Sequence, residues 1–424
     1  MGPTTVGTER PARPGNRVVL SVLLVAVTCL SQFYRVSNSV IAPELARELG
    51  LTSAQLGLAG GVFFVTLLLM QIPVGMWFDR YGPRCTVTAL SVLAVAGAVL
   101  LARAQQATDL IIARGLIGCG CAASFMATVL LCSRWFAPQR FATVLSWIYA
   151  SSNLGTLAAA TPLALASATL GWRHAFLALA GLTVLVTGLF FLGVRDYPPG
   201  QAPSRAQAES FGAIWGGLLQ VWRTPGLLPV LAMHTFAYAT MLTVLGVWAG
   251  PYLYEVYQLD SLARGHVLLA MGGALVLGIL CYGLLERLLR ARKKVVILGV
   301  LLTMATLLAL AALVQPPLWL AVSLLVTFTF VSAYAVVIVA QGRALFPDHL
   351  AGRGVTTVNM AQVLGAALLP MISGYMVDVC TRLGSGSPDL SYRLVFAFLA
   401  LCSLCGLLVY RQARESAAPG RPEA

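Results

Sequence analysis

The sequence predicts an all-α membrane protein with twelve transmembrane helices arranged in two pseudo-symmetric six-helix bundles. Of the 424 residues, 58% are hydrophobic and only 10% are charged, whereas soluble domains carry roughly a quarter charged residues. A chain this apolar needs lipid around it. Apolar runs of about 20 residues, long enough to cross a bilayer, follow one another along the chain. Sequence features also recur at an offset close to half the chain length, which favours two related bundles.

The twelve expected spans share this length and a near-absence of charge. They are 18–42, 53–77, 85–104, 108–132, 142–165, 174–194, 226–249, 265–285, 295–314, 318–344, 355–378 and 393–410. Short connections make neighbouring spans antiparallel. An even number of spans therefore places both termini on one side of the membrane.

Positive charge predicts which side that is. Of the 28 Lys and Arg residues, 20 fall in the loops and tails of the side that holds the termini, six fall on the other side, and Arg35 and Arg114 lie within spans. Because cytoplasmic loops are enriched in Lys and Arg, both termini are expected to be cytoplasmic. The same rule explains the net charge of +13 without a nucleic-acid partner. Outer loops without N-glycosylation-like sequences favour a bacterial inner membrane.

The chain divides into two halves of similar size. The expected units are a tail at 1–17, a bundle at 18–194, a linker at 195–225, a bundle at 226–410 and a tail at 411–424. The linker is rich in Pro, Gly and polar residues, and its FGAIWGGLLQVW segment is expected to lie as a helix on the membrane surface. GMWFDRYGPRC begins at Gly75 and GLLERLLRARKK begins at Gly283, 208 residues later. This offset is typical of a duplicated unit.

The loop between the second and third spans carries a compact motif, formed by Gly75, Asp79, Arg80, Gly82 and Arg84. Gly75 is expected to allow close approach of a neighbour at the end of its helix. Asp79 is expected to cap the next helix or to pair with an Arg of a neighbouring span. Such a pair would break and reform as the halves move, and so act as a latch. The alternative is a plain positively charged turn.

The fourth span contains LIIARGLIGCGCAA, residues 110–123. Gly118 and Gly120 are expected to let this helix pack closely on a neighbour. Arg114 lies six residues from the outer end of its expected span, near Asp109. Snorkelling or pairing with an acid, and contact with a solute, both remain open for Arg114.

Together these features resemble the major facilitator superfamily. The loop matches its G-x-L-a-D-R-x-G-R-K motif except at Trp77 and Pro83, and the fourth span matches its Arg- and Gly-containing motif except at Ile117. The resemblance covers the whole chain and implies a secondary transporter that works by alternating access. The sequence holds no phosphate-binding loop and no clustered catalytic triad, so neither an enzyme nor an ATP-driven pump is expected.

The stretch YRVSNSVIAPELARELGLTSAQLG begins in the first span at Tyr34 and runs through the loop after it. It resembles the first span and loop of the organic-anion transporters of that superfamily, which include anion:cation symporters and organophosphate antiporters. In those groups an Arg of the first span meets a carboxylate or phosphate, and Arg35 is the matching residue. Tyr34 stands where the symporters often have Asp, and Cys121 stands where they often have Glu. Since those acids carry protons, the departures leave two coupling partners open, a proton or an exchanged anion.

Arg35 also stands out on physical grounds alone. It lies about 27 Å along the helix from Arg17, within the hydrocarbon, where a charge costs roughly 2.5–3.5 kcal/mol on insertion scales. A polar stripe with helical spacing surrounds it, formed by Thr28, Ser31, Gln32, Arg35 and Ser39. No acid lies in the middle of any expected span. Arg35 is therefore expected to face a central cavity and hold an anionic group of a solute.

Other polar residues share faces of spans expected to line the path. The candidate solute contacts beside Arg35 are Gln32, Tyr149, Asn153, His234, Tyr238, Gln341 and Asn359. For each of them a hydrogen bond between helices is an equally good explanation. The Cys119/Cys121 pair does not share one helix face, and neither do the Met and His residues of spans seven and eight. No metal and no cofactor are expected.

The sequence therefore favours a monomeric secondary transporter that moves a small anionic organic solute across a lipid bilayer. Two alternatives stay open. One is an exporter of amphipathic compounds or siderophores, which would use aromatic and methionine side chains more than Arg35. The other is a transporter-like sensor that binds a ligand and signals without flux.

Overall fold

The computed structural model describes residues 14–199, 220–289, 291–346, 351–383 and 388–413. All regular structure within these ranges is helical. The first half contains α1 (Pro14–Leu49), α2 (Ser53–Leu69), α3 (Gln71–Ala102), α4 (Ala107–Trp135), α5 (Pro138–Ser152), α6 (Leu154–Ala158), α7 (Thr161–Leu170) and α8 (Trp172–Gly193). The second contains α10 (Leu227–Thr243), the π-helix η1 (Val244–Trp248), α11 (Ala249–Glu255), α12 (Ser261–Leu289), α13 (Arg292–Ala312), α14 (Leu318–Ser332), α15 (Ala335–Ala344), α16 (Ala351–Arg382) and α17 (Pro388–Tyr410).

These elements correspond to the twelve expected spans, several of which are broken. Ten described helices are long and apolar enough to cross a bilayer, and Ser53–Leu69 is a shorter apolar helix. Within α3, Gly82 takes φ 79° and ψ 162°, a region open mainly to glycine. The second span is therefore α2 with residues 71–81, and the third is 83–102. The fifth span is α5–α7, the seventh is α10–α11 and the tenth is α14–α15.

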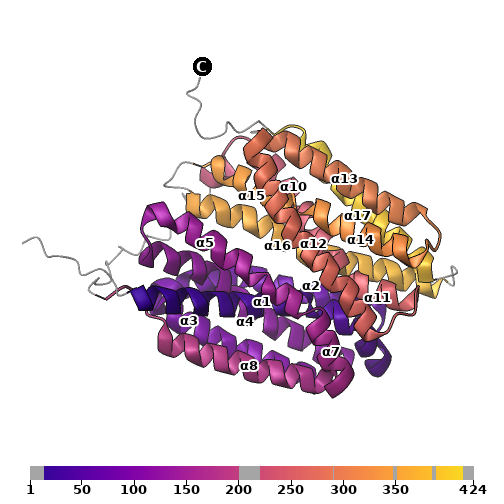
Figure 1. Ribbon diagram of the computed structural model, residues 1–424, viewed down its shortest axis with the longest axis horizontal. Helices are drawn as coiled ribbons and strands as arrows, with labels where there is room; N and C mark the ends of the chain where they lie inside the picture. Colours follow the sequence, from indigo (N-terminus) through magenta and orange to yellow (C-terminus); the bar gives the residue numbers. More distant parts are fainter. Residues whose placement is uncertain (1–13, 200–219, 290, 347–350, 384–387, 414–424) are drawn as a thin grey trace, which may run out of the picture.

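The helices form two bundles that lie side by side (Figure 1). The indigo-to-magenta helices of the first half occupy the lower part of the view, and the orange-to-yellow helices of the second half occupy the upper part. At one end, Arg17 near the start of α1 lies over the ring of Phe136 at 6.0 Å, and Lys293 donates to the Arg411 carbonyl just past α17 at 2.8 Å. We call this end the termini face and the other end the opposite face.

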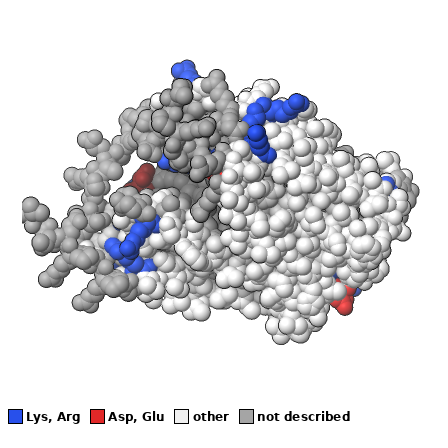
Figure 2. Space-filling model, turned by 45° about the horizontal axis from the view of Figure 1, so that its top comes forward, with Lys and Arg blue, Asp and Glu red and all other residues white. Residues whose placement is uncertain are grey.

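Exposed charge gathers toward the two ends of the molecule. Figure 2 shows Lys, Arg, Asp and Glu side chains toward the ends of the molecule, with a broad uncharged surface between them. Exposed aliphatic side chains such as Leu185, Leu192, Leu277 and Leu301 contribute to the uncharged surface of the protein. This pattern is that of a protein embedded in a bilayer. Most of the expected surface helix, residues 211–219 of FGAIWGGLLQVW, lies outside the described residues.

The glycines of the fourth span pack as expected. A Cβ atom at Gly118 would lie 2.2 Å from the Phe63 carbonyl oxygen, and one at Gly120 would lie 2.5 Å from the backbone nitrogen of Ala94. Neither backbone can yield to a side chain there. Small residues at both positions are thus what allows α4 to approach α2 and α3 so closely.

The two halves meet at the opposite face. In α2, a Cβ atom at Gly57 would lie 2.9 Å from the Gly374 Cα atom of α16. The Gly250 amide of α11 donates to Ser39 Oγ of α1 at 3.1 Å, and Thr161 of α7 lies 3.3 Å from His266 Nδ1 of α12. In the described part of the chain, α4 and α5 make no comparable contact with α10 or α15. The two bundles are therefore in contact with each other at the opposite face, and the protein is closed there.

Candidate solute-binding site

Arg35 lies at the junction of the two halves. Its Nη1 donates to the hydroxyl of Tyr238 on α10 at 3.3 Å, and its guanidinium carbon is 5.8 Å from the centre of the Phe64 ring. The side chain is half-buried. Its Nε has no hydrogen-bond partner, and no carboxylate pairs with it, among the residues that the structure describes. Arg35 is thus a cation with unused hydrogen-bonding capacity.

Tyr34, the residue before it, points into the first half. Its side chain is fully buried, and its hydroxyl lies 2.9 Å from Thr183 Oγ1 on α8. Because Thr183 donates to the Leu179 carbonyl at 2.8 Å, we assign Tyr34 as the donor to Thr183. The phenol therefore links α1 to α8 and does not face the contact between Arg35 and Tyr238.

Arg114 is fully buried beside the same stretch of α1. Its Nη1 donates to the Tyr34 carbonyl at 2.8 Å, its Nε donates to the Ala59 carbonyl at 3.3 Å, and its guanidinium lies 5.0 Å from the Phe63 ring centre. Asp109 instead accepts from the Gln105 amide at 3.0 Å. Arg114 therefore neither snorkels nor pairs with Asp109. It ties α4 to the backbones of α1 and α2.

The second half contributes a cluster of uncharged polar side chains. His234 lies one turn from Tyr238 on α10, is 1% exposed, and has no hydrogen-bond partner for either ring nitrogen among the described residues. The Gln362 side chain of α16 lies beside it without good hydrogen-bond geometry. Gln362 in turn donates to Asn359 Oδ1. Polar side chains therefore follow one another from Arg35 on α1 to Tyr238 and His234 on α10 and then to Gln362 on α16.

Gln362 is not among the solute contacts that the sequence led us to expect. Its signal was present in the sequence, since it lies three residues after Asn359 and so on the same helix face. The sequence does not show that this face meets α10. That contact depends on the close packing of α16 against α10, where a Cβ atom at Gly365 would lie 1.9 Å from the Thr235 carbonyl oxygen.

The other expected solute contacts are Gln32, Tyr149, Asn153 and Gln341, and they do not all lie near Arg35. Tyr149 stacks on Phe125 of α4 with ring centres 4.8 Å apart, and its hydroxyl donates to the Phe125 carbonyl at 3.3 Å. Asn153, which follows α5, donates to the Tyr149 carbonyl of that helix at 3.0 Å. Gln32 is half-buried on α1, about one turn nearer the termini face than Arg35. Gln341 is fully buried and accepts from the Tyr410 hydroxyl of α17, so the structure does not bring it to Arg35.

The polar stripe of the first span does not line one cavity. Thr28 donates back to the Leu24 carbonyl of its own helix at 2.7 Å, and Ser39 takes part in the closure at the opposite face. In this conformation both hydroxyl groups are buried and hydrogen-bonded elsewhere, so neither joins the contact between Arg35 and Tyr238. Short hydroxyl side chains satisfy themselves locally on a helix, which sequence spacing does not reveal.

The loop motif between the second and third spans is held by a residue outside it. Asp196, which follows α8, accepts from the Arg84 amide at 2.8 Å, so it caps the helix that starts after Gly82. Asp79 is exposed and has neither a capping nor an ion-pair partner in the described chain, and Arg80 lies over the Tyr81 ring at 5.3 Å.

Gly75 has no close neighbour in this conformation. A Cβ atom there would meet nothing within 4 Å, so the close approach expected at this position is not seen here. Helix ends at a bundle surface often have no neighbour, and the spacing of a motif does not show whether one is present.

Comparisons with known proteins agree with this architecture. The sequence model of the Major Facilitator Superfamily matches residues 23–370 and 251–424. The chain is similar to the uncharacterized transporter YybO of Bacillus subtilis, with 33% identity over 195 residues that cover 45% of this chain and 44% of that protein. It is similar over nearly its whole length to a probable sulfoacetate transporter, SauU, of Cupriavidus necator, with 26% identity over 93% of this chain and 95% of the relative.

Two further similarities complete the comparison. The D-galactonate transporter of Escherichia coli is 24% identical over 87% of this chain and 91% of its own. Among solved structures, a bacterial homolog to the human lysosomal transporter Spinster, in an inward-facing and unoccupied conformation, superposes with a TM-score of 0.80 and 17% identity, over 96% of this chain and 100% of that one. This chain belongs to the Major Facilitator Superfamily and is a multi-pass membrane transporter, not an enzyme.

Proposed function

We propose that the protein moves a small organic anion by alternating access, with Arg35 holding the anionic group of the solute. The observation that carries this proposal is a mid-span guanidinium that has no carboxylate partner in the described chain and touches the other half through Tyr238. Coulomb attraction is strong where water is excluded. A guanidinium also presents a planar fork that matches a carboxylate, sulfonate or phosphate.

The names of two relatives support an anionic substrate. One is described as a probable sulfoacetate transporter and another as a D-galactonate transporter, and both of those solutes are organic anions. In this chain the second half adds the uncharged groups of Tyr238, His234, Asn359 and Gln362. We infer that these bind the polar, uncharged part of the solute and that Arg35 binds its charge.

We further propose that the termini face is cytoplasmic, since 20 of the 28 Lys and Arg residues belong to it. The closure at the opposite face then corresponds to an inward-facing conformation. A solute held by Arg35 on one half and by Tyr238 on the other would draw the halves together around it. That is the step that alternating access requires.

Exchange of one anion for another is the coupling mode that we favour. In the described spans no carboxylate lies beside Arg35 to carry a proton, and Tyr34 is engaged with Thr183. Exchange needs only that the loaded carrier change conformation more readily than the empty one.

The first test is binding, read as thermal stabilisation of the purified protein by a panel of carboxylates, sulfonates, phosphates and metal chelates. We expect at least one organic anion to stabilise the parent and Arg103→Gln, a change at an exposed cation of the opposite face, but not Arg35→Gln. Equal stabilisation of Arg35→Gln would contradict the proposal. Stabilisation by apolar cations in place of anions would favour the exporter, and binding without counterflow would favour the sensor.

A further inference from the structure

We propose that Glu44 and Arg264 form the gate at the opposite face, an ion pair that holds the halves closed there and opens whenever the solute site faces that side. Glu44 lies near the end of α1, and Arg264 lies in the first turn of α12. Arg264 Nη2 donates to Glu44 Oε1, across 220 residues of sequence. Among the ion pairs of the described residues, this one alone joins the first half to the second.

The pair lies on the route that a solute must take. Glu44 is nine residues beyond Arg35 on the same helix, or about 13 Å toward the opposite face. Val40 lies between them, is 2% exposed, and lines a small cavity with Leu245 and Leu268 of the second half. Traffic between Arg35 and the opposite face therefore requires that the halves separate at Val40 and at the ion pair.

The composition of the pair suits a contact that opens and closes. The Arg264 side chain is 1% exposed and Glu44 is 22% exposed, so both charges have lost much of their hydration. Yet Glu44 Oε2 and Arg264 Nε have no hydrogen-bond partner in the described chain. In a buried pair with incomplete hydrogen bonding, attraction exceeds the desolvation cost only narrowly, so the closed contact opens at a small cost in free energy, whereas loss of one partner is costly. Arg264 also lies over the Tyr254 ring of its own half at 5.1 Å, which supports the cation when the pair is open.

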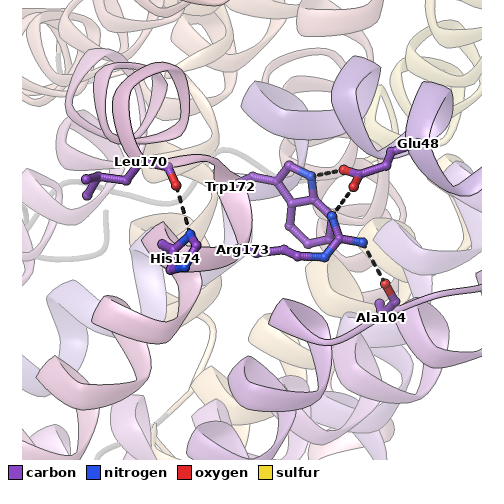
Figure 3. A network of polar contacts seen from close by, with 6 residues as sticks. All are labelled: Glu48, Ala104, Leu170, Trp172, Arg173 and His174. Atoms are coloured by element: carbon purple, nitrogen blue, oxygen red, sulfur yellow. Dashed lines mark hydrogen bonds and ion pairs between the residues drawn. The ribbon is translucent and has the colours of Figure 1, made fainter.

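Glu48, one turn beyond Glu44 on α1, pairs within its own half and so contrasts with Glu44. Glu48 accepts from Trp172 Nε1 at 2.5 Å and from Arg173, whose Nη2 donates to the Ala104 carbonyl at 3.0 Å. Figure 3 shows these groups converging from the end of α1, the start of α8 and the loop after α3, all of the first half. Rocking of the halves as rigid bodies would leave the Glu48 network intact and would separate Glu44 from Arg264. Glu44 and Glu48 are thus matched acids with opposite predicted roles.

Accessibility of position 40 tests the gate without any solute. The reporter is Val40→Cys in reconstituted full-length protein, with labelling by a membrane-impermeant maleimide quantified at that position by mass spectrometry. Removing one partner of a buried pair leaves the other charge uncompensated, so Glu44→Gln is expected to raise the labelling rate about tenfold. Glu48→Gln is expected to leave it near the parent rate.

The reversed pair, Glu44→Arg with Arg264→Glu, guards against simple misfolding, because it is expected to return labelling toward the parent rate. Equal labelling in the parent and Glu44→Gln would overturn the gate, and so would an equal rise in Glu48→Gln. Failure of the reversed pair to differ from Glu44→Gln would do the same. Because the readout needs no solute, its outcome does not depend on whether Arg35 binds an anion, so failure of the gate and failure of the proposed substrate role can be told apart.

Discussion

Arg114 of α4 donates a 2.8 Å hydrogen bond to the main-chain carbonyl of Tyr34 in α1, one residue before the cation that we propose holds the solute. A second bond to the Ala59 carbonyl ties α2 to the same guanidinium. We propose that Arg114, which is fully buried beside Phe63, is a positioning residue that acts on Arg35 through the backbone of α1.

Replacing this fork by a single ammonium tests that role. Arg114→Lys cannot reach both carbonyls with the geometry of a guanidinium, so α1 is expected to shift slightly and apparent solute affinity to fall about tenfold, or about 1.4 kcal/mol. The maximal rate should change much less. The measurement is the concentration dependence of counterflow, with Arg103→Lys as the control. A variant with parent kinetics would show that the contact has no bearing on the site.

Tyr34 is predicted to serve packing alone. Tyr34→Phe removes one buried hydrogen bond and leaves Thr183 bonded to Leu179, which costs about 0.5–1.5 kcal/mol of stability. Thermal unfolding should therefore move down by a few degrees, while transport and its dependence on pH stay as in the parent. Loss of transport in a variant that still unfolds cooperatively would instead assign the phenol a part in coupling.

Tyr238 is predicted to strengthen solute binding without being essential. Tyr238→Phe keeps the ring and removes the only hydroxyl that crosses from the second half to Arg35 in the described chain. Loss of one such hydrogen bond is expected to weaken binding by roughly fivefold, or about 1 kcal/mol, far less than Arg35→Gln. Titration of the thermal shift with the solute provides the comparison. Equal losses in the two variants would mean that the hydroxyl, not the charge, dominates recognition.

Replacement of Gly82 by alanine is predicted to destabilise the protein, whereas the same change at Gly75, in the same loop motif, is not. Gly82→Ala forces an L side chain to φ 79° against Asp196 and is expected to cost about 1–3 kcal/mol. Gly75→Ala meets open space within a helix and is expected to be neutral or to stabilise by up to about 1 kcal/mol. The measurement is the midpoint of thermal unfolding of each variant relative to the parent. Equal destabilisation would contradict the geometry at Gly82.

The sequence predicted the features that follow from the bilayer and from local spacing. Apolar runs had to be long enough to cross the hydrocarbon, so the twelve spans could be located, and Gly118 and Gly120 showed where backbones approach. The breaks near Met70, Asn153 and Ala333 could not be located, because each depends on packing around a helix that is continuous in hydropathy.

The candidate site was predicted unevenly for the same reason. Arg35 could be identified because an unpaired charge in hydrocarbon is costly wherever its neighbours lie. Gln341 and Arg114 could not be assigned, since their partners, Tyr410 and the carbonyls of Tyr34 and Ala59, come from other helices. Asp196 was missed because a capping acid 112 residues away leaves no local pattern.

Counterflow in proteoliposomes tests the central claim most directly. Vesicles loaded with the organic anion that stabilises the parent are diluted into labelled anion, and accumulation is followed for the parent, Arg35→Lys and Arg35→Gln. The account predicts rapid accumulation by the parent, a reduced rate for Arg35→Lys, which keeps the charge but loses the fork, and none above background for Arg35→Gln. Accumulation by Arg35→Gln at the parent rate would contradict it.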